Sequence, residues 1–221
     1  MTNAMQLDPA TTPEEIEARS CAIIDAEISE PRPFSGLLWP VARRCVHTLG
    51  DTTIVADLRL SSLGLAAGVA ALSRGCTVYT DTCMAAAGLP LRRMRPLGVT
   101  VTPLMALPDL EIVARRRGVT KSRAAVEVMA ERFEGQIVVI GNAPTALMVL
   151  MDVLAQGTPA PALIVGMPVG FVNAAQSKAL LNKSPWPHFT LLGRKGGSAV
   201  AAACVNALAE MALAGIRPLQ Q

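Results

Sequence analysis

Residues 136–155 read QIVVIGNAPTALMVLMDVLA, and this stretch decides the fold class. Its first part, Gln136 to Ile140, is a short β-branched run of the kind that forms a buried strand. Its last part, Thr145 to Ala155, has a helical pattern, and the junction between the two parts is rich in Gly and small residues. A strand that leads through such a junction into a helix is the repeating unit of a parallel sheet.

The same alternation extends along the chain in both directions. Further β-favouring runs lie at 76–80, 99–102, 162–165 and 188–192, and helical patterns lie at 63–73, 107–133, 173–181 and 198–214. The longest helical pattern contains Gly118, where we expect an interruption. Strands separated by helices need crossover connections, which place helices on both faces of the sheet. We therefore predict one α/β domain over residues 1–221, a three-layer α/β/α Rossmann-like fold with a mainly parallel five-stranded sheet, and a flexible segment at 1–13.

Composition excludes several classes of function. The chain has 221 residues, of which 51% are hydrophobic, 3% aromatic and 17% charged, with a net charge of +3. Few aromatic side chains and a mild positive charge argue against nucleic acid binding. The N-terminal residues are polar and acidic, unlike a signal peptide, and the apolar stretches at 137–154 and 199–213 are interrupted by polar residues. We expect a cytoplasmic protein that does not enter a membrane.

The cysteines and histidines limit the available chemistry. Five cysteines are scattered without a CxxC pair, as expected of free thiols in a reducing compartment, and we predict no metal site. Of the two histidines, His188 begins a predicted strand and suits a packing role. His47 lies in a helix predicted from Pro40 to a stop at Gly50, three and four residues after two arginines. It is the candidate acid or base, although a lone helical histidine is more commonly structural.

Three strand-to-helix junctions are candidates for ligand binding, namely 141–145, 166–171 and 193–198. In an open parallel sheet they lie at the carboxyl edge, where helix N-termini favour anions. Several anionic anchor points would suit a ligand with several carboxylates or phosphates, whereas a single glycine-rich junction is more often only a turn. The chain contains no G-x-G-x-x-G, no phosphate-binding loop with its lysine after the glycines, and no G-x-S-x-G. These absences disfavour a dinucleotide or ATP enzyme.

Together, the motifs resemble one family, the precorrin-8X methylmutases with their cobalt-precorrin-8 counterparts. The likeness runs from about residue 16 to about residue 214. It is carried by Ser20 with Ile23-Ile24-Asp25-Ala26-Glu27, Val41-Ala42-Arg43-Arg44-Cys45-Val46-His47 with Gly50-Asp51, Asp81-Thr82-Cys83-Met84, Thr120-Lys121-Ser122, Ile140-Gly141-Asn142-Ala143-Pro144-Thr145, Gly166-Met167-Pro168-Val169-Gly170-Phe171, Ser177-Lys178 and Gly193-Arg194-Lys195-Gly196-Gly197-Ser198. Each motif is modest alone, but their joint order is highly specific.

The resemblance implies an isomerase of cobalamin biosynthesis that needs no cofactor and works as a homodimer with its active site near the interface. The family moves a methyl group from ring carbon 11 to ring carbon 12 of a carboxylate-rich tetrapyrrole, giving hydrogenobyrinate, or cobyrinate from the cobalt form. The family's active-site histidine falls on His47 and its substrate-contacting serine on Ser20. The other expected substrate-binding residues are Arg43, Asp81, Met84, Thr120, Lys121, Ser122, Asn142, Thr145, Lys178, Arg194, Gly196, Gly197 and Ser198.

Two motifs depart from the family pattern. The family's Thr-Arg-Ser is Thr120-Lys121-Ser122 here, so a point charge replaces a bidentate fork, and the family's Ala-Ala-Glu-Ser-Lys has Gln176 in place of the glutamate. Our hypothesis is that His47, as imidazolium, donates a proton or a strong hydrogen bond to a ring nitrogen and so eases the methyl shift. The alternatives are a non-catalytic corrinoid carrier and a Rossmann-like nucleotide-binding protein. Either the cobalt-free or the cobalt-containing substrate is compatible with the sequence.

Overall fold

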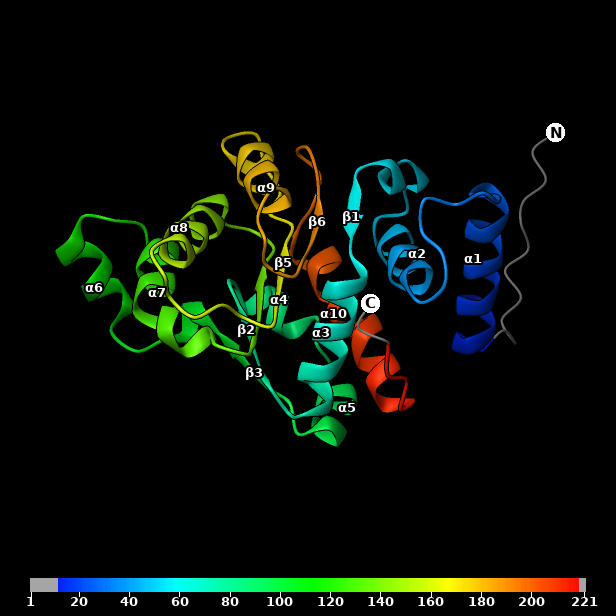
Figure 1. Cartoon of the computed structure of the whole chain (residues 1–221), viewed down its shortest axis with the longest axis horizontal. Coiled ribbons are helices and arrows are strands. Elements are labelled where there is room, and N and C mark those ends of the chain that lie inside the picture. Colours follow the sequence, from blue (N-terminus) through cyan, green and yellow to red (C-terminus); the bar gives the residue numbers. More distant parts are fainter. Residues whose placement is uncertain (1–11, 219–221) are drawn as a thin grey trace.

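A six-stranded sheet forms the centre of the molecule in the computed structural model, which describes residues 12–218 (Figure 1). Its strands are β1 (Leu58–Leu60), β2 (Thr77–Thr80), β3 (Thr100–Pro103), β4 (Ile137–Ile140), β5 (Leu163–Gly166) and β6 (His188–Leu191). The order across the sheet is β1-β6-β5-β4-β2-β3, and only β1 runs antiparallel to its neighbour. The predicted mainly parallel α/β sheet is confirmed, but the prediction of five strands is wrong.

The strand missing from the prediction is β1, which consists of only three residues with Arg59 at the centre. Such a segment shows too few apolar residues to establish a period of two. It becomes a strand because it pairs with β6, with Leu58 opposite Leu191 and Leu60 opposite Phe189. Its conformation is therefore set by tertiary pairing rather than by local preference.

Helices cover both faces of the sheet. They are α1 (Pro13–Glu27), α2 (Leu38–Leu49), α3 (Ser62–Ser73), α4 (Cys83–Ala87), α5 (Leu91–Met94), α6 (Leu110–Arg117), α7 (Lys121–Met129), α8 (Pro144–Ala155), α9 (Ala174–Asn182) and α10 (Ser198–Leu213). In β4, Ile137 and Val139 join the core under α2, α3 and α10, whereas Val138 and Ile140 join the core under α7, α8 and α9. The predicted layering is therefore observed, and β4 is apolar throughout because both of its faces are buried.

Local signals set the helix boundaries much as expected. The predicted interruption near Gly118 is confirmed, since Gly118 adopts a left-handed φ of 64° between α6 and α7. Gly50 ends α2 in the same way, with φ of 61°. Of the segment expected to be flexible, residues 1–11 lie outside the described part of the chain. Helix α1 begins at Pro13, and Thr12 and Glu15 form a reciprocal capping box at its N-terminus.

The connections place a topological switch point between β2 and β4. From β2 the chain moves outward to β3 and then returns to the other side of β2 to form β4. The loops after these two strands diverge at the carboxyl edge, and ligands of doubly wound sheets bind in such a crevice. At the two ends of the molecule, α1 and α2 lie beside β1, whereas α6 and α7 lie far from them (Figure 1).

Candidate functional site

The predicted catalytic histidine lies on the exposed side of α2. Burial of Trp39, Val41, Cys45 and Val46 fixes the orientation of this helix, which leaves His47 in its last turn and exposed to solvent. The C-terminal end of a helix carries partial negative charge, which favours a positively charged side chain there. The sequence therefore places His47 where it can meet a ligand.

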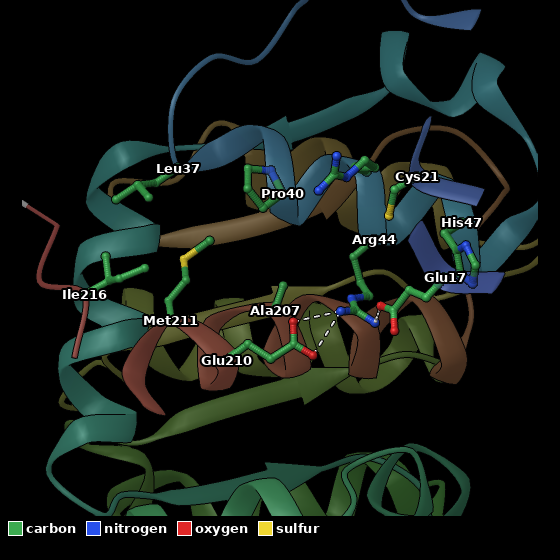
Figure 2. A pocket seen from close by; sticks show the side chains of 11 residues that line it. Glu17, Cys21, Leu37, Pro40, Arg44, His47, Ala207, Glu210, Met211 and Ile216 are labelled. Carbon is green, nitrogen blue, oxygen red and sulfur yellow. Dashed lines mark hydrogen bonds and ion pairs between the residues drawn. The ribbon is translucent and has the colours of Figure 1, made fainter. Parts of the chain in front are cut away.

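A hollow of about 270 Å³, the Arg44 hollow, lies on one side of His47 (Figure 2). It is lined by residues of α1, α2 and α10 and of the chain after α10, among them Glu17, Cys21, Pro40, Arg44, His47 and Glu210. Figure 2 shows Arg44 reaching from α2 to Glu210 on α10, with Glu17 of α1 beside both Arg44 and His47. Two consecutive helices, α1 and α2, and the distant α10 thus form one wall of the candidate site.

The two arginines near His47 are already paired with carboxylates. Arg44 lies 3.0 Å from Glu17 and 2.7 Å from Glu210, and Glu210 also binds Arg93. Arg43 Nη1 donates to Asp25 at 2.7 Å, and Asp25 also accepts the Trp39 indole N–H at 2.8 Å.

These pairs neutralise the cations that the sequence places beside the imidazole. A substrate carboxylate that binds Arg43 has to compete with Asp25 on α1.

A second hollow, the Ser20 hollow, lies on the other side of His47. It is lined by Ser20, Ile23, Ile24, Glu27, Val46, His47, Gly50, Asp51 and Thr52. The Ser20 hydroxyl donates to the Ile16 carbonyl at 2.9 Å within α1. The family resemblance predicted both Ser20 and His47 as site residues from separate motifs. The structure shows that both residues line one hollow between α1 and α2.

At the switch point, Asp81, which we expected to contact substrate, binds backbone N–H groups of the chain itself. Its side chain is 1% exposed and accepts backbone N–H bonds from Gly141 at 3.1 Å, Asn142 at 2.7 Å and Ala143 at 2.9 Å. The N–H groups of the β4–α8 junction, which we expected to meet an anionic ligand, are thus occupied by the chain's own carboxylate. Asn142 remains exposed beside them.

The loop 193–198 carries the next group of predicted residues. Arg194 is exposed and its guanidinium lies 5.2 Å from the ring centre of Phe171, which is 84% exposed. Gly196 has no room for a side chain, because a Cβ there would lie 2.3 Å from the Met167 carbonyl oxygen. Gly197 donates to the same carbonyl at 2.8 Å, and the buried Ser198 begins α10.

Lys178, another of the expected substrate-binding residues, lies beneath the loop 193–198. It is fully buried on α9, and its Nζ donates to the Lys195 carbonyl at 2.6 Å. Burial lowers the pKa of Lys178 to about 8, partly offset by Asp57. Its observed contact supports the 193–198 loop from beneath.

The remaining predicted residues lie away from His47. Thr120 caps α7, Ser122 follows in its first turn, and Lys121 pairs with Glu111 at 2.7 Å, which lowers the pKa of Glu111. Thr120 and Thr145 line a common hollow beside α8. The remaining residue, Met84, is 75% exposed on α4. Because α7 and α2 lie at opposite ends of the molecule (Figure 1), one protomer does not bring the 120–122 motif to His47.

Several residues of the site had not been predicted. Glu17 and Glu210 were not predicted because their ion-pair partner, Arg44, lies on another helix. A local sequence pattern contains no signal for such a pair. Asp51 and Lys195 contact each other across 144 positions of the chain. Asp51 did offer a signal, since an aspartate directly after a C-capping glycine is a strong candidate to cap the next helical turn.

The described part of the chain shows neither a cluster of metal-binding side chains nor a helix that could span a membrane. Within residues 12–218, no group of three or more His, Cys, Asp or Glu side chains is arranged to hold a metal ion. Over the same range, no helix is both long enough and apolar enough to span a bilayer.

Comparisons with known proteins match this architecture. Residues 15–211 match the family model described as precorrin-8X methylmutase. The precorrin-8X methylmutase of Pseudomonas aeruginosa is 45% identical over 174 residues, covering 78% of this chain and 83% of the relative. The cobalt-precorrin-8 methylmutase of Salmonella typhimurium is 40% identical over 203 residues, covering 89% and 94%. A crystal structure of the precorrin-8X methylmutase from Thermus thermophilus superposes with a TM-score of 0.84 at 39% identity, covering 94% of this chain and all of that one.

Proposed function

Because this chain belongs to the precorrin-8X methylmutase family, we propose that it moves a methyl group from ring carbon 11 to ring carbon 12 of precorrin-8X or of its cobalt form. The activity is that of an isomerase in cobalamin biosynthesis. An intramolecular shift needs neither a hydride nor a methyl donor, so the protein's task is to bind the macrocycle and polarise it. The relatives named above include both precorrin and cobalt-precorrin enzymes, so we propose either form as the substrate of this chain.

His47 is the proposed acid, and the observation that carries this assignment is its position. It is exposed at the end of α2 and lines both the Arg44 hollow and the Ser20 hollow. As imidazolium, it would donate a proton or a strong hydrogen bond to a ring nitrogen of the bound tetrapyrrole. That bond draws electron density from the conjugated ring and makes the carbon that receives the methyl group more electron-poor.

The carboxylate arms of the macrocycle need donors around the ring. Arg43 and Arg194 can supply guanidinium groups, and Lys121 a compact ammonium. Ser20 adds a hydroxyl in the Ser20 hollow, and Asn142 an amide at the carboxyl edge. These donors come from several elements, which suits a large ligand with carboxylates along its rim.

A homodimer is proposed to complete this site. The 120–122 motif lies at the opposite end of the protomer from His47 (Figure 1), so a second copy would be needed to bring the two together. Exposed Met84, Phe171 and Val172 near the carboxyl edge offer apolar surface for such a contact. A closed two-fold dimer would contain two equivalent sites of this kind.

Subunit mixing tests the shared site. His47→Ala and a Lys121→Ala/Ser122→Ala double variant should each lose most turnover. Random mixing makes half of the dimers hybrid, each with one intact site, so about one quarter of wild-type turnover should return. A mixture that shows only the sum of the two residual activities would contradict the shared site.

A cytoplasmic location is proposed from the state of the thiols. All five cysteines are free, and Cys45 and Cys204 remain unlinked with their sulfurs 3.4 Å apart in the core. Their proximity raises the pKa of Cys204 well above its ordinary range, together with burial. The five cysteines are scattered, odd in number and without a CxxC pair, a pattern that suits a reducing compartment.

The rival functions have less support. The switch point, where a Rossmann-like sheet would bind a nucleotide's phosphates, has its junction N–H groups taken by Asp81. The strand order around that point supports our description of the fold as Rossmann-like. It does not by itself favour nucleotide binding. A non-catalytic carrier is not supported by the comparisons, whose matches are named as methylmutases.

The catalytic assignment is tested by replacing each of the two histidines in turn. His47→Ala should abolish conversion of precorrin-8X while changing product affinity by less than about threefold, because the imidazole acts mainly in the transition state. His188→Ala is the matched control, since its ring bonds the Trp186 carbonyl at 2.8 Å and faces a different hollow. Wild-type turnover by His47→Ala would exclude the assigned role.

A further inference from the structure

Lys195 places an ammonium group against Asp51, one of the residues that line the Ser20 hollow. Its side chain is 55% exposed, and its Nζ contacts the Asp51 carboxylate and, at 3.2 Å, the Thr53 hydroxyl. Asp51 itself lines the Ser20 hollow together with His47 and Ser20. The loop 193–198 therefore reaches the segment directly after α2 through the charged contact of Lys195 with Asp51.

The backbone that carries this ammonium is firmly held. The Lys195 carbonyl accepts the bond from the buried Lys178, and its neighbour Arg194 accepts a backbone bond from Gly170 at 3.1 Å. Gly196 is packed against Met167 with no space for a Cβ. With the backbone fixed, the exposed Lys195 side chain can change partner by rotating about its own bonds.

The partner carboxylate is also held in place. Asp51 caps the helical turn η1 (Thr52–Ala56) by accepting from the Thr53 N–H at 2.9 Å and the Thr53 hydroxyl at 2.6 Å. Lys195 and Thr53 together lower the pKa of Asp51 to about 2. Asp51 is therefore ionised at neutral pH and compensates the charge of Lys195 in the free protein.

We propose that Lys195 is a further substrate-binding residue, which takes one carboxylate arm of the tetrapyrrole, and that Asp51 is a positioning residue that holds its ammonium until the substrate arrives. This inference rests on the proposed function, because it requires the macrocycle beside His47. A substrate carboxylate has to displace Asp51 from Lys195, so the strength of the Asp51 contact sets the affinity for a carboxylate at this position. The two side chains should then act on affinity in opposite directions.

Charge-removing variants separate this role from a purely structural one. Asp51→Asn retains an oxygen that can cap η1 but loses the negative charge, so it should lower the KM for precorrin-8X about two- to fivefold. Lys195→Gln should raise KM about three- to tenfold, and Lys195→Arg should restore it to within about twofold of wild type. The double variant should match Lys195→Gln, because Asp51 acts only through the lysine.

The controls separate failure of this inference from failure of the proposed function. Lys183→Gln removes an exposed lysine at the end of α9 and should leave KM unchanged. Urea unfolding shows whether each variant keeps the wild-type fold. A rise in KM for a folded Asp51→Asn, or an unchanged KM for Lys195→Gln, would overturn the inference while wild-type turnover still supports the proposed function. A wild type that does not convert precorrin-8X would overturn both.

Discussion

Replacing Asp81 with Ala tests the arrangement at the switch point. The substitution removes the shared acceptor of three backbone N–H groups, those of Gly141, Asn142 and Ala143. Gly141 and Ala143 are buried, whereas Asn142 is exposed and can bond water. Two orphaned buried donors cost about 1–3 kcal/mol each, so we expect a loss of about 2–6 kcal/mol in the free energy of unfolding. For a chain of this length that corresponds to a fall of roughly 4–24 °C in Tm.

Urea unfolding followed by circular dichroism measures this loss. Asp152→Ala is the matched control, because Asp152 is exposed on α8, and it should change stability by less than about 0.5 kcal/mol. Asp81→Asn should lose less than Asp81→Ala, since the amide keeps one oxygen to accept. An Asp81→Ala protein within about 1 kcal/mol of wild type would refute the role given to this carboxylate.

Two further predictions concern the loop 193–198. Burial lowers the pKa of Lys178 to about 8 in the folded protein, whereas its ordinary value in the unfolded chain is 10.5. Between about pH 8 and pH 10.5 the unfolded state therefore binds more protons than the folded state. The free energy of unfolding of wild type should then increase as pH rises through this range. Urea unfolding of wild type and of Lys178→Met at several pH values should show this gain in wild type relative to the variant, by no more than about 3 kcal/mol. A difference between the two proteins that stays constant with pH would contradict the prediction. Gly196→Ala forces a Cβ against the Met167 carbonyl and should weaken product binding by about tenfold or more in a fluorescence titration. Gly193→Ala meets no atom within 4 Å and should weaken binding less, and equal effects of the two would argue against a tightly packed loop.

Local sequence signals predicted most of the fold because most of its elements are defined locally. The apolar run of β4, the junction after it and the helical pattern of α8 lie within one continuous stretch, and Gly50 and Gly118 end helices through their own left-handed backbone. Strand β1 had no such signal, since Leu58 and Leu60 are ordered by pairing with β6. Its position depends on residues more than a hundred positions away, which a local pattern does not contain.

The candidate site shows the same division. The ordered motifs led to His47 and Ser20, and the structure places both in one hollow. The environment of a charged side chain was harder to predict, because it depends on distant partners. Lys178 and Asp81 were both predicted from the motifs as substrate-binding residues, but the motifs did not indicate that Lys178 is buried beneath the Lys195 carbonyl or that Asp81 binds the β4–α8 junction. In both cases tertiary hydrogen bonds determine the role.

We expect this chain to catalyse the methyl shift with His47 as the acid. ¹³C NMR of an anaerobic incubation with precorrin-8X, whose migrating methyl group is isotopically labelled, follows that shift at the reacting carbon. With wild type, the labelled resonance should move from the position of a methyl on ring carbon 11 to that of a methyl on ring carbon 12, and with His47→Ala it should stay. A resonance that does not move with wild type, or that moves as fast with His47→Ala, would contradict the account.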